Sequence, residues 1–316
     1  MNREDVRFLD SSRKEEKRIQ EDEQNPYKLF WSGIVAAISV HRVLRLYLDS
    51  EKVRTLTAKC FLLNGVIFLG SMMMFDQVVR PSIVALAGGV FMLTEDGNVV
   101  GQADFVMSLI FRFFWIVPAY AISFVLNCVW YEEIADVAFK YYSPDRKSKR
   151  LGFTRLVAEE LYRICMMIFI FLEVSLIGYI PIAGHVLSIS MLTWVYAYYC
   201  FEYKWILQGL SLSRRLKQIE TNWVFYAGFG TPCTLMTYFF PTLVAGGLFG
   251  VLFPIFLLTA MSVSMSPNHG SSKGGGRLPI FAPSKHVVER LVRLGFRRDG
   301  SSSSSSSSSK KVRRKK

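Results

Sequence analysis

The chain has 316 residues, 51% of them hydrophobic, and its 38 Lys and Arg outnumber its 25 Asp and Glu to give a formal charge of +13. A basic soluble protein would suggest nucleic acid as a partner, but the apolar residues here stand in long blocks. Such blocks are typical of an integral membrane protein, and they exclude nucleic-acid binding as the main interpretation.

The first 28 residues are polar and mixed in charge, with no apolar core and no small-residue cleavage site, so we expect no cleavable signal peptide. The stretch from Pro26 to Asp49 follows. Its apolar residues recur at helical spacing before cations appear: Trp31, Ile34, Val35 and Ile38, then His41, Arg42 and Arg45. This pattern predicts an amphipathic helix that lies in the membrane interface and does not cross.

Two blocks come next that are long enough to cross a bilayer. A hydrocarbon core of about 30 Å needs about 20 helical residues at about 1.5 Å each. The segment from Cys60 to Val79 meets this length, and we expect Pro81 to end it. The segment from Phe105 to Tyr131 is long enough to cross tilted, or kinked at Pro118.

Two further apolar blocks have the pattern of helical hairpins. The block from Ile164 to Phe201 has 38 residues, with Glu173 as its one Asp, Glu, Lys or Arg, and "GYIPIAG" stands at its centre. The block from Trp223 to Met261 has 39 residues and none of these charges, and "FFPTLVAGG" interrupts it at Pro241. Pro and Gly at the centre of each block predict a tight apolar turn between two helices.

The sequence therefore predicts an all-α integral membrane protein with about six transmembrane helices, including the two hairpins. We expect the hairpins to cross fully, because each arm is about as long as a crossing requires. In the alternative, each hairpin stops inside the bilayer and returns, because its turn is apolar and other helices can shield its backbone.

Cations predict the orientation, because Lys and Arg favour the cytosolic side. With six crossings, the cation-rich segments share one side with both termini, and the opposite side has Arg80 as its sole cation. We expect both termini to be cytosolic and the chain to have three parts. These are an arm with the interfacial helix (1–58), a membrane domain (59–262) and a basic, Ser-rich, largely disordered tail (263–316).

The tail contains "SKHVVERLVRLGFRR", which could form a short basic amphipathic helix, and it ends in nine serines and "KKVRRKK". The terminal cations have three interpretations. They could bind anionic lipid, act as a retrieval address for the endoplasmic reticulum, or form a solvated tail.

Candidate catalytic residues are not grouped in the sequence. The four histidines are far apart, and no metalloprotease motif, phosphate loop or nucleophile elbow is present. The five cysteines lie in or beside apolar blocks without close spacing, so we expect small buried hydrophobes and neither disulfides nor a zinc site. We expect no enzyme activity, no metal and no cofactor.

Two ionisable residues, Arg112 and Glu173, fall inside the predicted membrane helices. Such residues are costly in lipid and suggest a functional site or an ion pair, although Arg112 could also extend to the interface. Gly228, Phe229 and Gly230 begin the second hairpin. The small residues Gly228 and Gly230 suit close helix packing, and a broken helix at this point would instead expose amides that could hold an anion.

The stretch "YYCFEYKW", Tyr198 to Trp205, places an acid and a base among aromatic residues. Glu202 and Lys204 stand two apart, so on a helix they do not face each other. We expect the aromatic residues to form an interfacial belt, with Glu202 and Lys204 reaching water.

Several strings resemble the etoposide-induced protein 2.4 family, multi-pass proteins of the endoplasmic reticulum membrane. They lie between Asn64 and Ala260: "VPAYAISFVLNCVWYEEIADVAF", "YCFEYKW", "RRLKQIETNWVFYAGFGTP" and "LFPIFLLTA". Within them, Glu202, Tyr203, Trp205, Asn222 and Trp223 form the most legible signature.

The resemblance implies a role in autophagy, in the formation or maturation of autophagosomes, and in some members a link to growth suppression and apoptosis. The implied partners are membrane lipids and other membrane or autophagy proteins. The family is more distantly similar to CysZ-type sulfate permeases, which share the "GFG" string and are associated with hairpins that enter the bilayer partway. An anion permease is thus an alternative function, with Gly228, Phe229 and Gly230 as the candidate anion site. A second alternative is a scaffold that recruits partners through "RRLKQIE".

Overall fold

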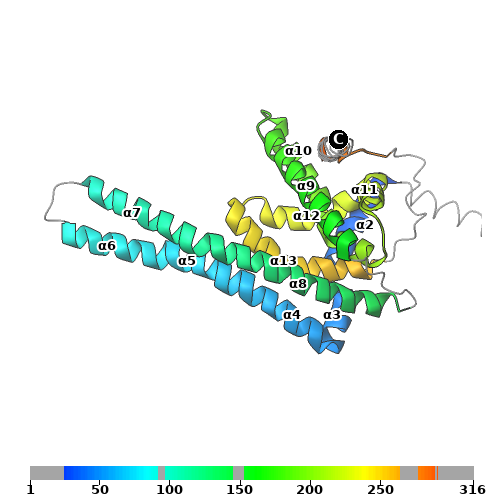
Figure 1. Cartoon of the computed structure of the whole chain (residues 1–316), viewed down its shortest axis with the longest axis horizontal. Coiled ribbons are helices and arrows are strands. Elements are labelled where there is room, and N and C mark those ends of the chain that lie inside the picture. Colours follow the sequence, from blue (N-terminus) through cyan, green and yellow to red (C-terminus); the bar gives the residue numbers. More distant parts are fainter. Residues whose placement is uncertain (1–24, 92–96, 145–152, 264–276, 289, 291–316) are drawn as a thin grey trace, which may run out of the picture.

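The computed structural model describes residues 25–91, 97–144, 153–263, 277–288 and 290, and this part of the chain forms helices and turns without a β-strand. The protein is an all-α membrane protein, as predicted. Figure 1 shows a long helical hairpin that projects from a bundle of the other helices. The elements, with π-helices marked η, are α2 (Pro26–Ile38), α3 (Val40–Asp49), α4 (Glu51–Phe61), η1 (Leu62–Gly70), α5 (Ser71–Met74), η2 (Phe75–Val79), α6 (Arg80–Phe91), α7 (Gly97–Phe111), η3 (Arg112–Ile116), α8 (Val117–Tyr142), α9 (Phe153–Gly178), α10 (Ala183–Leu207), α11 (Leu212–Thr221), α12 (Trp223–Thr237) and α13 (Thr242–Ser262).

Two nearly continuous helices form the long hairpin, one from α4 through α6 and the other from α7 through α8. The prediction that Pro81 would end the first helix is wrong. Pro81 is the second residue of α6 and directly follows the π-helical η2, where a change of hydrogen-bond register accommodates a residue without an N–H. Pro118 follows η3 in the same way, so the second helix is also continuous.

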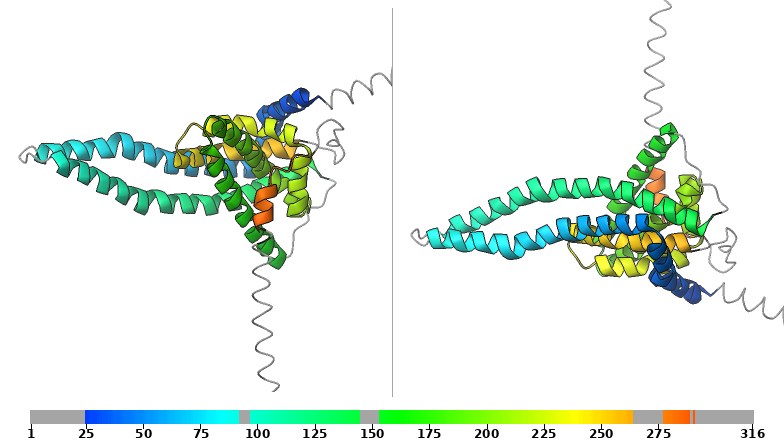
Figure 2. Two further views of the ribbon diagram at one scale, coloured as in Figure 1. Left: turned by 90° about the horizontal axis from the view of Figure 1, so that it is seen from above. Right: turned by 90° about the horizontal axis from the view of Figure 1, so that it is seen from below.

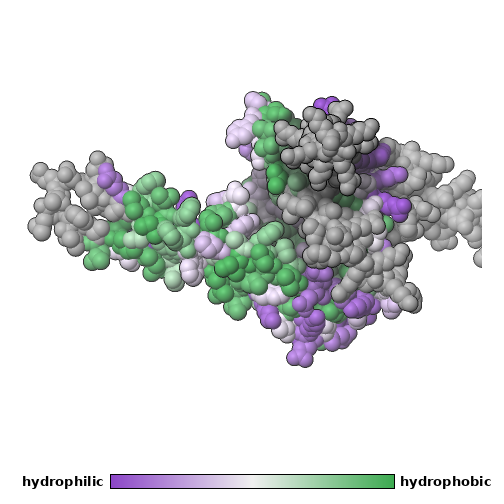
Figure 3. All heavy atoms as spheres, viewed as in Figure 1, coloured by the Kyte–Doolittle hydropathy of each residue, from purple (hydrophilic) through white to green (hydrophobic). Residues whose placement is uncertain are grey.

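The outer surface of the long hairpin is mostly apolar between Lys59 and Arg80, and Figure 3 shows much of this band in green. The exposed side chains of Asp76, Gln77 and Arg112 interrupt it. The exposed apolar side chains of the band on the first helix include Leu62, Val66, Met73, Met74 and Val78. At about 1.5 Å per residue Lys59 and Arg80 are about 31 Å apart along the helix, close to the thickness of a bilayer core. The crossing predicted from Cys60 to Val79 falls in this interval.

An ion pair joins the two long helices at the far end of the apolar band. Nε and Nη2 of Arg80 donate to the two carboxylate oxygens of Asp104, each at 2.7 Å. α6 and α7 continue past this pair as helices.

Four helical stretches in the described part of the chain are long and apolar enough to cross a membrane: Pro26–Asp49, Glu51–Leu86, Asp104–Tyr142 and Thr242–Ser262. The first of these is divided at Ser39, where the backbone leaves the helical region with ψ 54° and separates α2 from α3. α2 packs along α12 and keeps Trp31, Val35 and Ile38 exposed on its other side. The apolar stripe of the predicted amphipathic helix is therefore on α2, and its cations are exposed on α3. The length and composition of Pro26–Asp49 as a whole would also allow a crossing.

The turns of both hairpins lie where the sequence predicts them. α9 ends at Gly178 and α10 begins at Ala183, while Pro241 directly precedes α13. Both turns expose large apolar side chains: Tyr179, Ile180, Ile182, Phe239 and Phe240. Figure 2 shows that the α9–α10 hairpin is steeply inclined to the long hairpin.

The α12–α13 hairpin is shorter than the long hairpin beside it. A Cβ at Gly247 would lie 2.6 Å from Leu69, which fixes the level of α13 along the first long helix. α13 begins about five residues before Gly247, whereas Arg80 lies about eleven residues past Leu69, so the turn stops about 9 Å short of Arg80. In Figure 1 the long hairpin continues well beyond this turn.

Candidate functional site

The charged residues of the signature stretch lie inside the bundle, at the end of α10 that adjoins α11. Glu202 is 0% exposed and Lys204 is 9% exposed. The prediction that both side chains reach water is wrong. Because they point to different sides of α10, each meets a different neighbouring element.

Glu202 forms a buried ion pair with α11. Its Oε1 accepts from Nη1 of Arg215 at 2.8 Å and from the hydroxyl of Tyr198 at 2.8 Å. Nε of Arg215 donates to the carbonyl of Leu210 at 3.1 Å, in the loop between α10 and α11. The pair thus fixes α11 against α10, and neither charge is left in the bundle without partners.

Lys204 binds the carboxyl end of α13. Its ammonium donates to the carbonyls of Ala260 and Met261, each at 3.1 Å, and to that of Val263. The last carbonyls of a helix lack partners within the helix and carry its negative dipole end. Lys204 therefore satisfies these carbonyls and joins α10 to α13.

The aromatic residues around these charges do not form the interfacial belt that we expected. Tyr198, Phe201 and Trp205 are buried, and only Tyr199 and Tyr203 are partly exposed. The ring of Phe201 lies 4.8 Å from that of Phe229 and 5.1 Å from that of Tyr226. The signature stretch is a packing centre between α10 and α12.

Gly228 and Gly230 let α12 approach two other helices. A Cβ at Gly228 would lie 2.0 Å from the carbonyl oxygen of Phe30 on α2, and one at Gly230 would lie 1.8 Å from that of Thr193 on α10. Gly33 is equally close to α12 from the other side, 2.2 Å from the oxygen of Phe225. Backbones at this distance exclude any side chain at these positions.

Phe229 lies between these two glycines and is buried. α12 runs without a break from Trp223 to Thr237, through Pro232, so residues 228–230 belong to a continuous helix. Helix packing is the role that this geometry shows. Anion binding by Gly228, Phe229 and Gly230 stays a prediction.

Arg112 and Glu173 have separate surroundings. Arg112 is exposed on η3 of the long hairpin. Glu173 is partly buried on α9 and accepts a 2.7 Å hydrogen bond from the hydroxyl of Ser284. Among the described residues, the structure does not bring these two predicted side chains together.

The remaining signature residues support the helix junctions. Asn222 directly precedes α12, and its amide donates to the carbonyl of Gln218 at 3.3 Å instead of capping that helix. The carbonyl of Trp223 accepts from the indole of Trp194 at 2.9 Å. Tyr203 packs near Phe253 of α13, with ring centroids 6.1 Å apart.

A buried polar cluster that the sequence analysis missed lies between the long hairpin and α13. The side-chain amides of Asn64 and Asn127 donate to each other at 3.0 and 2.8 Å. The hydroxyl of Tyr131 and the amide of Asn64 reach the carbonyl of Gly250 at 3.0 and 3.4 Å. The available signal was one asparagine in each of the first two apolar blocks, because a lone side-chain amide in lipid requires a hydrogen-bond partner.

The fold and the site define a class: a multi-pass helical membrane protein in which helical hairpins pack on one long hairpin and are pinned by buried charges. One family described as "Sulfate transporter CysZ/Etoposide-induced protein 2.4" matches residues 39–254. The chain belongs to this family, which accounts for more than half of its length.

Curated relatives agree with this assignment. The Protein EI24 homolog of Arabidopsis thaliana is 36% identical over 289 residues, which cover 80% of this chain and 90% of the relative. The Protein EI24 homolog of Dictyostelium discoideum is 28% identical over 273 residues, 85% of each chain. Ectopic P granules protein 4 of Caenorhabditis elegans is 27% identical over 154 residues, 46% of this chain and 47% of the relative. No solved structure matches the chain significantly.

Proposed function

We propose that this chain is a multi-pass protein of the endoplasmic reticulum membrane that acts in autophagy, in the formation or maturation of autophagosomes, and that it has both termini in the cytosol. The observation that carries the proposal is the family match over residues 39–254, which includes the whole signature region. The geometry supports a structural role for that region, because its charged side chains form ion pairs and hydrogen bonds between helices.

The decisive experiment is autophagic flux in cells that lack the gene. We expect early autophagic membranes to accumulate, and wild-type protein to restore the flux. A variant that is inserted but cannot form the Glu202–Arg215 pair, such as Arg215→Leu, should restore it poorly. Normal flux in the null cells would contradict the proposal.

Recruitment of autophagy proteins is the form of action that the surface of α11 supports best. Arg214 and Lys217 of α11 are exposed, whereas Arg215 is buried in its ion pair. Reversal of the two exposed charges, Arg214→Glu with Lys217→Glu, should therefore release a cytosolic partner without changing localisation. Loss of the protein from the endoplasmic reticulum in this variant would argue against that role.

The second candidate is an anion permease, because the family description includes a sulfate transporter. Liposomes that contain the purified protein should then take up radiolabelled sulfate faster than protein-free liposomes do. Uptake at the rate of protein-free liposomes would end this alternative, and it would leave the autophagy proposal untouched.

A further inference from the structure

The chain returns to the bundle after α13, and residues 277–288 pack against α9, α10 and α11. Arg277 binds the carboxylate of Glu220 on α11 through Nε, at 2.8 Å, and through Nη2. The amide of Leu278 donates to the carbonyl of Glu220 at 3.0 Å. Phe281 is buried, and its ring lies 6.2 Å from that of Tyr198 on α10. This part of the predicted tail is therefore folded onto the helices.

A helix over residues 282–288 continues this segment beside α9. Ser284, which is buried, donates to Glu173, and Val288 is buried at the end of the helix. The basic helix predicted from Ser284 onward is thus present over its first residues, and the rest of it lies outside the described residues. Contacts with Glu220 at one end and Glu173 at the other hold the segment in place.

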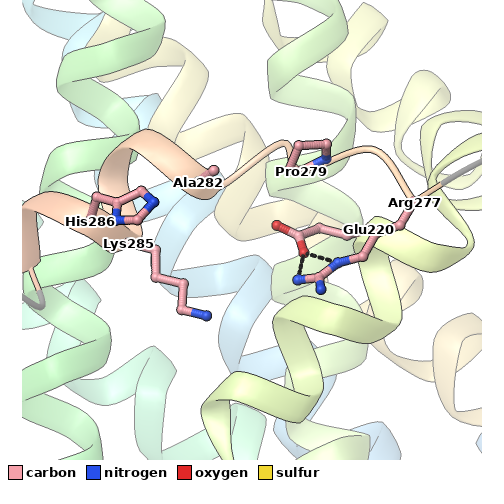
Figure 4. A pocket seen from close by; sticks show the side chains of 6 residues that line it. All are labelled: Glu220, Arg277, Pro279, Ala282, Lys285 and His286. Carbon is pink, nitrogen blue, oxygen red and sulfur yellow. Dashed lines mark hydrogen bonds and ion pairs between the residues drawn. The ribbon is translucent and has the colours of Figure 1, made fainter.

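A cavity of about 390 Å³ opens between this segment and α11 (Figure 4). The lining residues are Glu220, Arg277, Pro279, Ala282, Lys285 and His286. Figure 4 shows the side chain of Lys285 extending toward the Glu220–Arg277 pair. The volume is within the range of about 300 to 1,000 Å³ that small-molecule sites occupy.

The charge of this cavity is suited to an anion. Among the described residues that line it, three are basic and one is an acid, and that acid, Glu220, binds Arg277. The guanidinium of Arg277 has five N–H donors, and the contacts with Glu220 use two groups of its fork. The half-exposed Arg277 therefore keeps donors for a second oxyanion.

The second cavity of the described structure gives a contrast of similar size. It measures about 380 Å³ and is lined by Glu51, Lys52, Thr55, Leu56, Lys59 and Glu133. Its two lysines are balanced by two acids, and Lys52 pairs with Glu133 at 2.8 Å. Positive charge in excess of negative charge therefore distinguishes the first cavity.

An apolar surface lies beside the helix that carries Lys285 and His286. On α9, to which Ser284 ties this helix, Ile168, Leu172 and Leu176 are all exposed. They stand four residues apart, so they form one stripe along α9. In a membrane protein such a stripe contacts acyl chains, and Lys285 and His286 beside it can bind the headgroup of the same lipid.

We propose that this cavity binds the phosphate headgroup of an anionic membrane lipid, with Arg277, Lys285 and His286 around the phosphate and the acyl chains along α9. Arginine with lysine suits a phosphate, because a guanidinium fork matches two of its oxygens. A free phosphate offers the same oxygens but has nothing to place on the stripe of α9.

Binding of short-chain dioctanoyl phosphatidic acid to the purified full chain in detergent tests this proposal, with titration calorimetry as the measurement. We expect saturable binding, and weaker binding by at least about tenfold in the double variant Lys285→Gln with His286→Asn, because loss of a charge-assisted contact lowers affinity by about tenfold or more. Lys285→Arg should retain the affinity. Arg277 is left intact, since it also neutralises Glu220.

The matched control is Lys52→Gln with Lys59→Gln in the balanced cavity, which should bind like wild type. Equal binding of dioctanoyl phosphatidylcholine, or full affinity in the Lys285 and His286 variant, would overturn the proposal. Inorganic phosphate that binds as tightly as phosphatidic acid would overturn the lipid assignment. The melting temperature of each variant in detergent verifies its fold, and a variant that melts well below wild type is replaced by Lys285→Met alone, for which the same loss of affinity is expected.

Discussion

Buried charges at the end of α10 are the main finding at the scale of single residues. The Glu202–Arg215 pair is almost fully shielded, with side chains 0% and 3% exposed. Removal of one partner from such a pair leaves a buried charge without compensation, which costs about 3–5 kcal/mol. An exposed pair such as Lys52–Glu133, at 57% and 42% exposure, is instead worth about 0–1 kcal/mol.

We therefore expect Arg215→Leu to lower the free energy of unfolding by about 3–5 kcal/mol. Unfolding in detergent, followed by tryptophan fluorescence, measures this loss. The matched control Lys52→Leu should stay within about 1 kcal/mol of wild type. The double variant Glu202→Leu with Arg215→Leu should recover part of the loss. If the double variant instead lost a further amount of unfolding free energy, about 3–5 kcal/mol relative to Arg215→Leu, the pairing would be contradicted.

The glycines of α12 give a second prediction at this scale. Gly230→Ala places a Cβ 1.8 Å from the carbonyl oxygen of Thr193, so the helices must separate. We expect a loss of at least about 1–3 kcal/mol and less folded protein on size-exclusion chromatography. Gly101→Ala is the control, because nothing lies within 4 Å of a Cβ at Gly101 on α7. A folded yield of Gly230→Ala equal to that of Gly101→Ala would show that α10 and α12 are not in contact here.

The sequence could predict that this stretch matters, but not what surrounds it. A string rich in aromatic residues beside charges is typical of a membrane interface, and the partners that bury it stand elsewhere in the chain. Arg215 belongs to α11, and the carbonyls that Lys204 binds belong to the end of α13. No local pattern contains these long-range contacts.

Among the elements, the two long helices differ most from the prediction. Prolines at 81 and 118 are usual helix breakers, but each follows a π-helical turn that accommodates it. The hairpin turns at Gly178 and Pro241 were predictable, because glycine and proline in an apolar block have few other uses. The helix from Ser284 onward was also predictable, but the contacts of residues 277–288 with α9, α10 and α11 were not, since the apolar stretch is short and polar residues surround it.

The contact between α10 and α13 can be tested through Lys204. Lys204→Met keeps the apolar stem but removes the donors to the carbonyls of Ala260, Met261 and Val263. We expect a loss of about 1.5–3 kcal/mol, as for a hydrogen-bonded charge. Hydrogen exchange should rise at the last turn of α13 more than at its first turn, and uniform exchange along α13 would argue against this anchor.

The whole molecule combines helices of two lengths. Between Lys59 and Arg80 the long hairpin has the length of a bilayer core, whereas the α12–α13 turn stops about 9 Å short of Arg80. Full crossing was expected from the lengths of the arms, with partial entry as the alternative, because both versions have the same charges and the same apolar arms. The packing of Gly247 on Leu69 favours partial entry of this hairpin.

Cysteine accessibility in sealed microsomes tests this depth. In a chain without native cysteines, Phe239→Cys at the α12–α13 turn should resist a membrane-impermeant maleimide from either side. In the proposed topology, Ser82→Cys, exposed past Arg80, should react after the lumen is opened. Labelling of Phe239→Cys from the lumen to the same extent as Ser82→Cys would show that the hairpin crosses.

The unequal lengths of the hairpins make the molecule a wedge. On the side of the bilayer where α11 lies, the cross-section includes the arms of every hairpin, while at the level of Arg80 and Asp104 it has narrowed to two helices. More lipid is therefore displaced from one leaflet than from the other. A bilayer crowded with such wedges lowers its energy by bending, with the broader leaflet on the outside of the curve.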